Sequence, residues 1–475
     1  MGPRVFGAVD IGASGGRVMA GVVDGPQTTL HTLHRFPNGP VQRDGHLRWD
    51  LTRLWAEVLT GLRLLARQFP ETESVGVDTW AVDYALLDRD RRLLAEPVSY
   101  RDGRSAAAVD LVHRRVPREQ LYAVNGLQFL PFTTVYQLEA EMAASLWDKA
   151  AHVALLPDWL ALQLTGELRT ESTNASTTGL IDAHTGDWAK DLLDRLDLPA
   201  DRLPPLIAPG EVVGTLTTTA VEQTGLRPGT LVTAVGSHDT ASAVVAVPAT
   251  TGRFAYVSSG TWSLAGLELQ APVITQDSRA ANFTNEGGVD GRTRFLRNVG
   301  GLWLLQESMR DWSEQGLTPD LDTLLADAER LPSGGPLIDV DDESFIAPGD
   351  MPRRIAAAAT GGTRAPGALQ DPAHTVRCIL DSLATAYART TRRATELSGA
   401  AVDVIHVVGG GSRNRLLCQV TANLTGVPVV AGPVEATALG NVLVQARALG
   451  AAPTTLEEIR ADLAATQPLR VHRPS

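Results

Sequence analysis

The sequence predicts an α/β protein of two domains, and three observations lead to this expectation. The chain has 475 residues, which exceeds the roughly 150–250 residues of one ordinary core. A glycine turn between two apolar strands occurs near the start of each half, at residues 8–17 and 256–264. Strand-forming and helix-forming segments follow each turn, as in folds that pack helices against a central sheet.

Composition indicates an acidic globular chain. Hydrophobic residues make up 44% and charged residues 20% of the sequence, and the formal net charge is −12. This charge, without a basic tail, argues against nucleic acid and anionic membranes as main partners. No apolar run reaches the ~20 residues of a membrane-spanning helix, and no signal peptide precedes the first strand. We expect a cytoplasmic protein, in which Cys378 and Cys418 are reduced core residues.

Lysine is nearly absent, because Lys149 and Lys190 are the only two in the chain. Walker-type NTPases, protein kinases and Schiff-base enzymes all depend on a placed lysine. Neither G-x-x-x-x-G-K-[ST] nor G-x-G-x-x-G occurs. The sequence therefore excludes these classes, and any phosphate chemistry has to rest on backbone amides, hydroxyls, carboxylates and a metal.

The first half begins with strands in a meander and continues with helices and further strands. Apolar alternation predicts the strands, and Asp50 in front of an amphipathic run predicts a capped helix. The expected elements are strands 5–11, 17–23 and 30–36, helix 51–68, a strand pair 75–78 and 81–87, helices over much of 105–165, strand 231–235 and helix 240–247.

A segment with proline, glycine and small polar residues at 247–252 marks the expected domain boundary. We therefore expect a first domain at 1–247 and a second at 248–475. The second half repeats the strand-turn-strand pattern. Its expected elements are strand 254–258, helix 302–315, an irregular Pro-, Gly- and Asp-rich stretch 332–372, helix 372–397, strand 404–408 and helix 413–424.

The first glycine turn carries Asp10 at the end of its strand. At a phosphate site, Asp10 would hold Mg²⁺ through water, because Mg²⁺ favours carboxylate and water oxygens; the alternative is an ordinary turn aspartate. Residues 12–16 also match G-x-S-x-G, the nucleophile elbow of hydrolases, around Ser14. That motif needs a helix after the serine, whereas residues 17–23 alternate like a strand.

The segment Gly236-Ser237-His238-Asp239-Thr240 lies between a predicted strand and a predicted helix, where α/β folds gather their ligands. Asp239 is the candidate general base for a hydroxyl that attacks a phosphoryl group, and His238 is a candidate hydrogen-bond partner of the same substrate. The alternative is that Ser237 or Asp239 only caps the following helix.

Three glycines at 409–411 form another strand-to-helix turn. Glycines there let a flat ligand pack on the backbone, and the helix N-terminus suits a nearby phosphate. In the two glycine hairpins, small residues bring backbone N–H groups close to an anion. Together these turns predict a polyphosphate held between two domains, and hence a phosphotransferase.

Taken in order, these segments resemble the sugar kinases of the FGGY type, within the actin-like ATPase superfamily. The resemblance covers about residues 4–450. It implies two actin-like, ribonuclease H-like α/β domains with a ligand cleft between them, the sugar bound by the first and ATP mainly by the second. The motifs that carry it lie at 8–19, 77–83, 127–132, 237–243, 258–264, 282–288, 301–306 and 431–436.

The resemblance also implies roles for individual residues. Asp239 would be the catalytic general base, and His238, Asp239, Thr240 and position 81 would contact the sugar. This chain has Ala81 where the family usually has glycine, and we expect the added methyl group to narrow the sugar pocket. The residues that would contact the nucleotide are Ala13, Ser14, Gly15, Gly16, Arg17, Thr261, Asn298, Gln306 and Gly410.

The activity implied by the resemblance is phosphorylation of L-rhamnulose at O1 in L-rhamnose catabolism, with ATP as donor and Mg²⁺ as cofactor. Another ketose or deoxyketose, such as L-fuculose, L-ribulose or D-xylulose, stays open as the substrate. A different class of function, a non-catalytic actin-like sugar sensor, also stays open. Monomer and homodimer are both compatible with the sequence.

Overall fold

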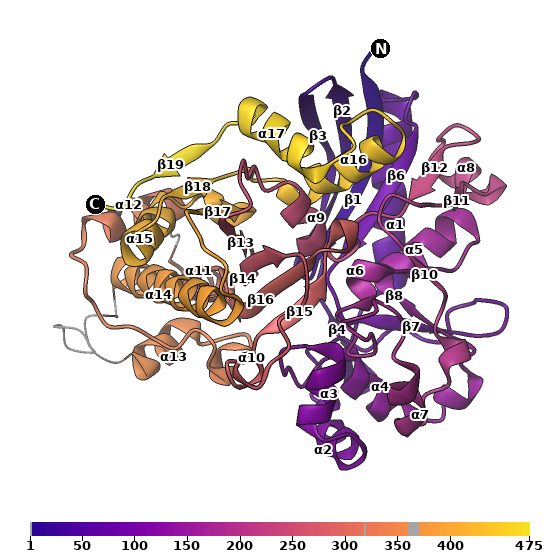
Figure 1. Cartoon of the computed structure of the whole chain (residues 1–475), viewed down its shortest axis with the longest axis horizontal. Coiled ribbons are helices and arrows are strands. Elements are labelled where there is room, and N and C mark those ends of the chain that lie inside the picture. The colour runs from indigo at the N-terminus through magenta and orange to yellow at the C-terminus, as the bar shows by residue number, and fades with distance from the viewer. Residues whose placement is uncertain (1, 318–319, 360–368, 370) are drawn as a thin grey trace. The chain divides into compact units, whose positions relative to one another are not determined.

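Two compact units make up the computed structural model, which describes residues 2–317, 320–359, 369 and 371–475 (Figure 1). Each unit is an α/β structure, so the predicted class is confirmed. The predicted domain boundary between residues 247 and 248 stays a prediction. Unit 1 consists of Met1–Thr250, Glu268–Phe295 and Ala436–Thr466, and unit 2 of Thr251–Leu267, Leu296–Glu435 and Gln467–Ser475.

Unit 1 combines strands and helices from three separate parts of the chain. The strands are β1 Arg4–Gly12, β2 Gly15–Asp24, β3 Gln27–Pro37, β4 Val41–Arg43, β5 His46–Arg48, β6 Ser74–Thr79, β7 Tyr84–Leu87, β8 His152–Leu155, β9 Thr170–Glu171, β10 Leu206–Ile207, β11 Val212–Thr215, β12 Leu231–Thr233 and β15 Thr284–Gly287. The helices are α1 Leu51–Gln68, α2 Ser105–Arg115, α3 Arg118–Asn125, α4 Thr134–Met142, α5 Leu156–Thr165, α6 Ser172–Ala175, α7 Lys190–Arg195, α8 Thr218–Thr224, α9 Asp239–Val245, α10 Gln276–Ala280, α16 Ala436–Ala448 and α17 Leu456–Thr466.

The main sheet of unit 1 has the strand order β11-β12-β6-β1-β2-β3. β1, β2 and β3 form the predicted antiparallel meander, and β6 runs parallel to both β1 and β12. The carboxyl ends of β1, β6 and β12 therefore point the same way. α/β folds bind their ligands at this edge of a parallel sheet.

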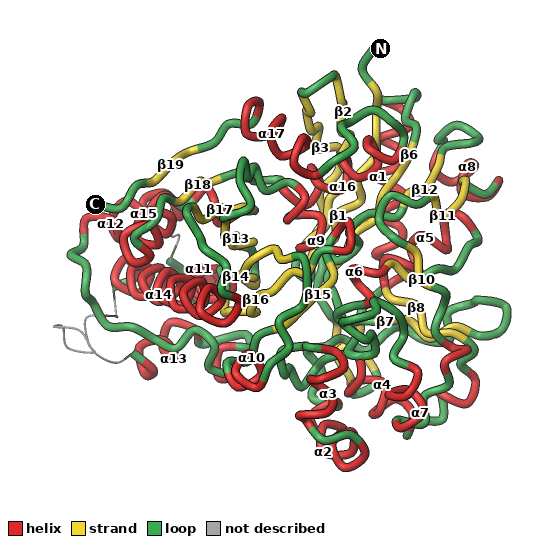
Figure 2. Tube along the Cα trace, viewed as in Figure 1, coloured by secondary structure: helices red, strands yellow, loops and turns green. Residues whose placement is uncertain are grey.

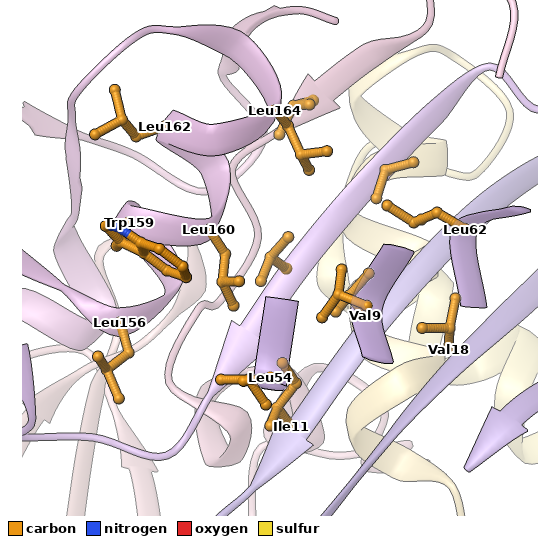
Figure 3. Packing of buried hydrophobic residues seen from close by; sticks show 14 of the residues in the cluster. Val9, Ile11, Val18, Leu54, Leu62, Leu156, Trp159, Leu160, Leu162 and Leu164 are labelled. Atoms are coloured by element: carbon orange, nitrogen blue, oxygen red, sulfur yellow. The ribbon is translucent and has the colours of Figure 1, made fainter. Parts of the chain in front are cut away.

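Side chains of β1 alternate between two hydrophobic cores. Val5, Val9 and Ile11 join a cluster with leucines of α1 and α5, part of which Figure 3 shows. Phe6 and Ala8 join a second cluster with side chains of α16. Because successive residues of a strand face opposite sides, α1 and α5 cover one face of the sheet, and α16, from near the end of the chain, packs against the other.

Unit 2 repeats this arrangement. β13 is antiparallel to β14 and parallel to β17, which is parallel to β18. The second sheet has the strand order β15-β16-β14-β13-β17-β18-β19, in which β15 belongs to unit 1. Its part β16-β14-β13-β17-β18 repeats the succession β3-β2-β1-β6-β12, and Figure 2 shows helices beside the strands. The remaining elements, of which β14 and β16 pass between the units, are β13 Phe254–Ser259, β14 Trp262–Leu269, β16 Thr293–Gly300, α11 Trp303–Glu314, α12 Leu321–Arg330, α13 Met351–Ala358, α14 Pro372–Ser398, β17 Val404–Val408, η6 Gly410–Arg413, α15 Arg415–Thr425, β18 Val429–Ala431 and β19 Arg470–His472.

Most predicted elements are found within a few residues, and two expectations are wrong. The predicted strand pair at 75–78 and 81–87 does not pair with itself: β6 joins the main sheet, whereas β7 pairs with β8. The predicted irregular stretch 332–372 contains α13, which begins at Met351 with Pro352 in its first turn. Proline suits that position because the first N–H groups of a helix have no partner within the helix. Residues 360–368 and 370 of this stretch lie outside the described residues.

Both cysteines are core residues, as the sequence predicts. Cys378 in α14 and Cys418 in α15 are buried, and neither forms a disulfide. Burial raises the pKa of Cys378 to about 11 and that of Cys418 to about 12. Among the described residues, no helix is both long enough and apolar enough to span a bilayer.

Candidate functional site

The first glycine turn of unit 1 holds an ion pair between its two strands. Asp10 and Arg17 are opposite in the register of β1 and β2, and Arg17 donates from Nη2 (2.7 Å) and Nε (2.9 Å) to Asp10 Oδ2. Asn38 fixes the turn, because its Nδ2 donates to Gly12 O and its backbone N–H to Ser14 O. β2 follows Ser14 directly, so the helix that a hydrolase nucleophile elbow requires is replaced by a strand.

A second carboxylate, Asp78, lies beside Asp10 on the parallel strand β6. It is fully buried, and Asn441 of α16 donates to its Oδ2 at 2.6 Å. Burial and then the charge of Asp10 raise the pKa of Asp78 well above its ordinary value, and Asp239 contributes in the same direction. The charges of Asp10 and Asp239 therefore both act on Asp78, and the charge of Arg17 acts in the opposite direction.

The segment before α9 is fixed by its backbone and by Glu171. Ser237 donates from its N–H (2.9 Å) and Oγ (2.8 Å) to Glu171 Oε2, and its carbonyl accepts from Thr79 N–H at the end of β6. His238 is the N-cap of α9 but its side chain makes no capping bond. The alternative that Ser237 or Asp239 serves as the helix cap is wrong, because Ser237 is bound to Glu171 and Asp239 is already the first helical residue.

Asp239 is the accessible carboxylate of this segment. Its side chain is 31% exposed, whereas His238 and Thr240 are buried. Thr240 Oγ1 donates to Asp239 Oδ1 at 3.1 Å, and His238 Nε2 lies 3.4 Å from the same oxygen. A carboxylate that is held at one oxygen and open to solvent can accept a proton from a bound hydroxyl.

Ala81 lies in the loop between β6 and β7, and the residues after it are tightly held. Val82 has φ of 68°, a strained conformation for a β-branched residue. Its carbonyl accepts from Thr134 Oγ1 at 2.7 Å. Asp83 accepts from the indole N–H groups of Trp49 (2.6 Å) and Trp80 (3.0 Å), and also from Gln137 and the Tyr100 backbone. These contacts fix the loop that presents Ala81.

The nucleotide residues predicted in the second half surround the glycine turn of unit 2. Leu302 N–H donates to Gly260 O and Trp303 N–H to Thr261 O, so the start of α11, which carries Gln306, is attached to the turn. β13 and β17 pair in parallel, which brings the turn containing Gly410 beside the end of β13. Asn298 lies on β16, two residues before Gly300, whose N–H is bound by Asp341.

Hydroxyl groups replace carboxylates around this second turn. Ser259 and Ser263 are opposite in register on β13 and β14. The hydroxyl of Tyr387, from α14, lies 2.6 Å from Ser263 Oγ and 3.3 Å from Ser259 Oγ. A Cβ at Gly411 would lie 2.0 Å from Ser259 Oγ, so glycine is required for this approach of η6 to β13.

The predicted site residues therefore form two groups, one in each unit. In unit 1 the structure brings together Asp10, the turn 13–17, the 81 loop and the segment 238–240. In unit 2 it brings together Thr261, Gly410 and the start of α11. Sequence reasoning named no role for the buried polar partners Glu171, Asp83, Glu286, Arg294 and Asn441. The sequence signal for these residues is a polar side chain within an otherwise apolar segment. Their partners could not be inferred from this signal, because they are distant in sequence.

The acidic side chains around Asp10 offer the oxygen donors that a hydrated magnesium ion prefers. Among the described residues, no group of three or more His, Cys, Asp or Glu side chains is arranged to hold a metal. Asp10, however, lies beside Asp78, and the charges of Asp10 and Asp239 both disfavour the ionised form of Asp78. A hydrated cation would relieve this repulsion, and Mg²⁺ commonly keeps several of its waters when it binds a protein.

The two halves of the chain match two family models. Residues 5–246 match the N-terminal domain, and residues 255–449 the C-terminal domain, of the FGGY family of carbohydrate kinases. The rhamnulokinase of Bacteroides thetaiotaomicron is 41% identical over 472 residues, which cover 99% of this chain and 96% of that protein. The rhamnulokinase of Enterococcus faecalis is 42% identical over 451 residues, which cover 94% of this chain and 90% of that protein.

Solved structures with the same fold are more distant in sequence. A gluconate kinase from Lactobacillus acidophilus superimposes with a TM-score of 0.81 at 18% identity, covering 100% of this chain and 94% of that one. A xylulose kinase from the same organism gives a TM-score of 0.79 at 17% identity, covering 99% and 94%. At this identity the likeness concerns the fold, and it agrees with the duplicated α/β architecture described above.

Proposed function

Since this chain belongs to the FGGY family of carbohydrate kinases, we propose that it phosphorylates L-rhamnulose at O1 with ATP, giving L-rhamnulose 1-phosphate and ADP. The choice of sugar is supported by the rhamnulokinases that match this chain along most of its length. The proposed setting is the cytoplasm, where ATP is supplied.

The exposure of Asp239 is the observation that supports the mechanism. Its carboxylate is accessible, whereas its polar neighbours are buried. In the proposed step, O1 of the sugar forms a bond to the γ-phosphorus and the bond from that phosphorus to the bridging oxygen of ADP breaks. The proton of the O1 hydroxyl moves to Asp239. Both His238 and Thr240 approach Oδ1, so we infer that Oδ2 receives the proton.

Charge neutralisation is the other requirement, because phosphoryl transfer depends mainly on positioning and electrostatics. Mg²⁺, bound at Asp10 through water, would neutralise charge on the transferring phosphoryl group. Arg17 and the backbone N–H groups of residues 13–16 would contact the phosphates from unit 1. Thr261, Asn298, Gln306 and Gly410 would contact the nucleotide from unit 2. The two lysines are not required in this scheme.

The test is ADP release from ATP·Mg²⁺ across a panel of L-rhamnulose, L-fuculose, L-ribulose, D-xylulose, D-fructose and glycerol. We expect the highest kcat/KM with L-rhamnulose. A clear preference for another sugar would refute the substrate and retain the kinase. The absence of turnover with every sugar, combined with measurable sugar binding, would support the sugar sensor instead.

Ala81 sharpens the choice of sugar. Replacing Ala81 with glycine removes one methyl group next to the proposed pocket, so we expect broader acceptance of ketoses with little loss of activity on L-rhamnulose. A methyl group in a pocket changes discrimination by about 10- to 200-fold at most. The measurement is kcat/KM for each sugar of the panel. A strong loss on the best substrate would mean that the alanine is matched to it.

A further inference from the structure

A buried ionic cluster lies next to Asp239, the proposed base. The proposed reaction assigns no role to two of the three residues in this cluster. The cluster consists of His238, Glu286 and Arg294, whose side chains are 8%, 6% and 0% exposed. Glu286 comes from β15 and Arg294 from the start of β16, and all three belong to unit 1. A buried arginine and a buried glutamate are costly unless they are paired and hydrogen-bonded.

The donor and acceptor inventory fixes the state of the histidine ring. Arg294 Nη2 makes a hydrogen bond of 3.2 Å with His238 Nδ1. A guanidinium group can only donate, so Nδ1 must accept and carries no hydrogen. The neutral ring then has its proton on Nε2, the nitrogen that lies 3.4 Å from Asp239 Oδ1.

The competing arrangement would place the proton on Nδ1, directed at Glu286 Oε2 at 3.3 Å. Arg294 opposes it, because an Nδ1–H would face the N–H groups of the guanidinium. Arg294 is itself oriented by donation from Nε to Gly287 O at 2.9 Å, so it cannot turn away without losing that bond.

Glu286 compensates the charge of the arginine. Its Oε2 lies 3.0 Å from Arg294 Nη1. Burial raises the pKa of Glu286 and the charge of Arg294 lowers it, and the pKa lies below its ordinary value. Glu286 is therefore ionised beside Arg294, and the pair presents a donor to Nδ1 without adding net charge next to the ring.

We propose that Arg294 and Glu286 are positioning residues that hold His238 in its Nε2–H form, so that the ring donates to Asp239 Oδ1 and orients the carboxylate for proton transfer. This inference rests on the proposed function, in which Asp239 is the base. The charged groups facing His238 are then Asp239 from α9, Glu286 from β15 and Arg294 from β16. Thr240 supports the same oxygen of Asp239.

The first experiment determines which nitrogen of the His238 ring carries the proton in the intact protein. The histidine rings are labelled with ¹⁵N, and the His238 signals are assigned by their absence from a His238→Gln spectrum, since the chain has 10 histidines. We expect an unprotonated Nδ1 and a protonated Nε2 at neutral pH. An Nδ1–H ring or a doubly protonated ring at that pH would overturn the proposal without any further variant.

The second experiment tests whether the position of the proton on the His238 ring affects kcat. Arg294→Met removes the donor and leaves Glu286 facing Nδ1, so the ring proton should move to Nδ1. We expect kcat to fall by roughly 10- to 100-fold, the size typical of residues that orient a functional group, with a smaller change in the KM for sugar. Arg294→Lys keeps a cationic donor and should restore part of the kcat. A fall in kcat with the Nε2–H ring retained would refute the proposal.

Glu268 offers a matched control. It is a buried carboxylate of unit 1, its side chain 4% exposed, and it pairs with Arg292 and Arg460. Glu268→Gln should lower thermal stability as the Arg294 variants do, while the His238 spectrum and kcat stay unchanged. If Asp239→Asn kept a normal kcat, the base role would fail, but the wild-type ring spectrum would still decide the state of His238 by itself.

Discussion

The two glycine hairpins share a backbone plan and differ in the charge beside it. In unit 1 the strands place Asp10 opposite Arg17, whereas in unit 2 they place Ser258 opposite Leu264 and Ser259 opposite Ser263. Asp10 lies near two further carboxylates, and Ser259 and Ser263 are held by the hydroxyl of Tyr387. The same strand order thus carries ionisable groups in one unit and neutral hydroxyls in the other.

This difference matters for the proposed reaction, because the two kinds of side chain interact differently with a phosphate. Carboxylates can accept a proton or hold a hydrated cation, but they repel a polyphosphate. Neutral hydroxyls and backbone N–H groups add no such repulsion. In the proposed function, the proton and the metal are therefore assigned to residues of unit 1, and most of the nucleotide contacts to residues of unit 2. Each half of this comparison can be tested separately.

Asp239→Asn should have the largest effect. Removing a general base lowers kcat by roughly 10²–10⁴, and the amide keeps the shape of the side chain. We expect ATP binding and the melting temperature to change little, measured by calorimetry on the same sample. Asp191→Asn makes the same substitution in the first turn of another helix of unit 1 and should leave kcat unchanged. A near-normal kcat for Asp239→Asn would remove Asp239 from the base role.

Asp83 gives a prediction for pH, because its carboxylate is buried. Burial raises the pKa of Asp83 from 3.8 to about 6, although four hydrogen bonds act in the opposite direction. Between these two values the folded state holds a proton that the unfolded state has released. Stability is therefore highest below pH 4 with respect to this group, and is lost as the pH rises through 6, by about 3 kcal/mol in total.

The measurement for Asp83 is the free energy of unfolding in urea at pH 4 and pH 7. Wild type should lose about 2.4 kcal/mol more over this interval than Asp83→Asn, which has no proton to release there. The comparison between the two proteins removes the contribution of every other carboxylate. Equal pH dependence in both would show that Asp83 ionises in the folded protein as easily as in the unfolded chain.

Two neighbouring glycines, Gly410 and Gly411, test the packing around the glycine turn of unit 2. A Cβ at Gly411 would overlap Ser259, whereas a Cβ at Gly410 would have no atom within 4 Å. We expect Gly411→Ala to destabilise unit 2 by about 1–3 kcal/mol, the usual result of overpacking, and Gly410→Ala to be close to neutral. If Gly410 contacts the nucleotide, Gly410→Ala should raise the KM for ATP without a change in melting temperature. Equal melting temperatures for both variants would contradict the packing argument.

Tyr387→Phe should have the smallest effect. The change removes one hydroxyl that lies between Ser259 and Ser263, and the net value of a hydrogen bond is about 1 kcal/mol. Thermal unfolding would measure this loss, and kcat should stay near normal because no charge is altered. A large fall in kcat would mean that the two serines need Tyr387 to hold the turn in its working form.

The sequence by itself determined the local structure, for physical reasons that act over short distances. The helix at 51–68 is confirmed with Asp50 accepting from Arg53 N–H at its N-cap, because a side-chain cap and an amphipathic pattern need only neighbouring residues. The meander of β1 to β3 and the strand β17 follow from apolar alternation in the same way. The family was evident because its motifs are themselves short segments in a fixed order.

Tertiary structure decided the rest, because it depends on partners far apart in the chain. Asn441 binds Asp78 across 363 positions of sequence, so no local pattern could place α16 in unit 1. Arg294 reaches His238 across 56 positions. Burial, which moves the pKa of Asp83, is likewise a property of the packed core. A sequence can name the carboxylates and the histidine of this site, but only packing sets which of them holds a proton.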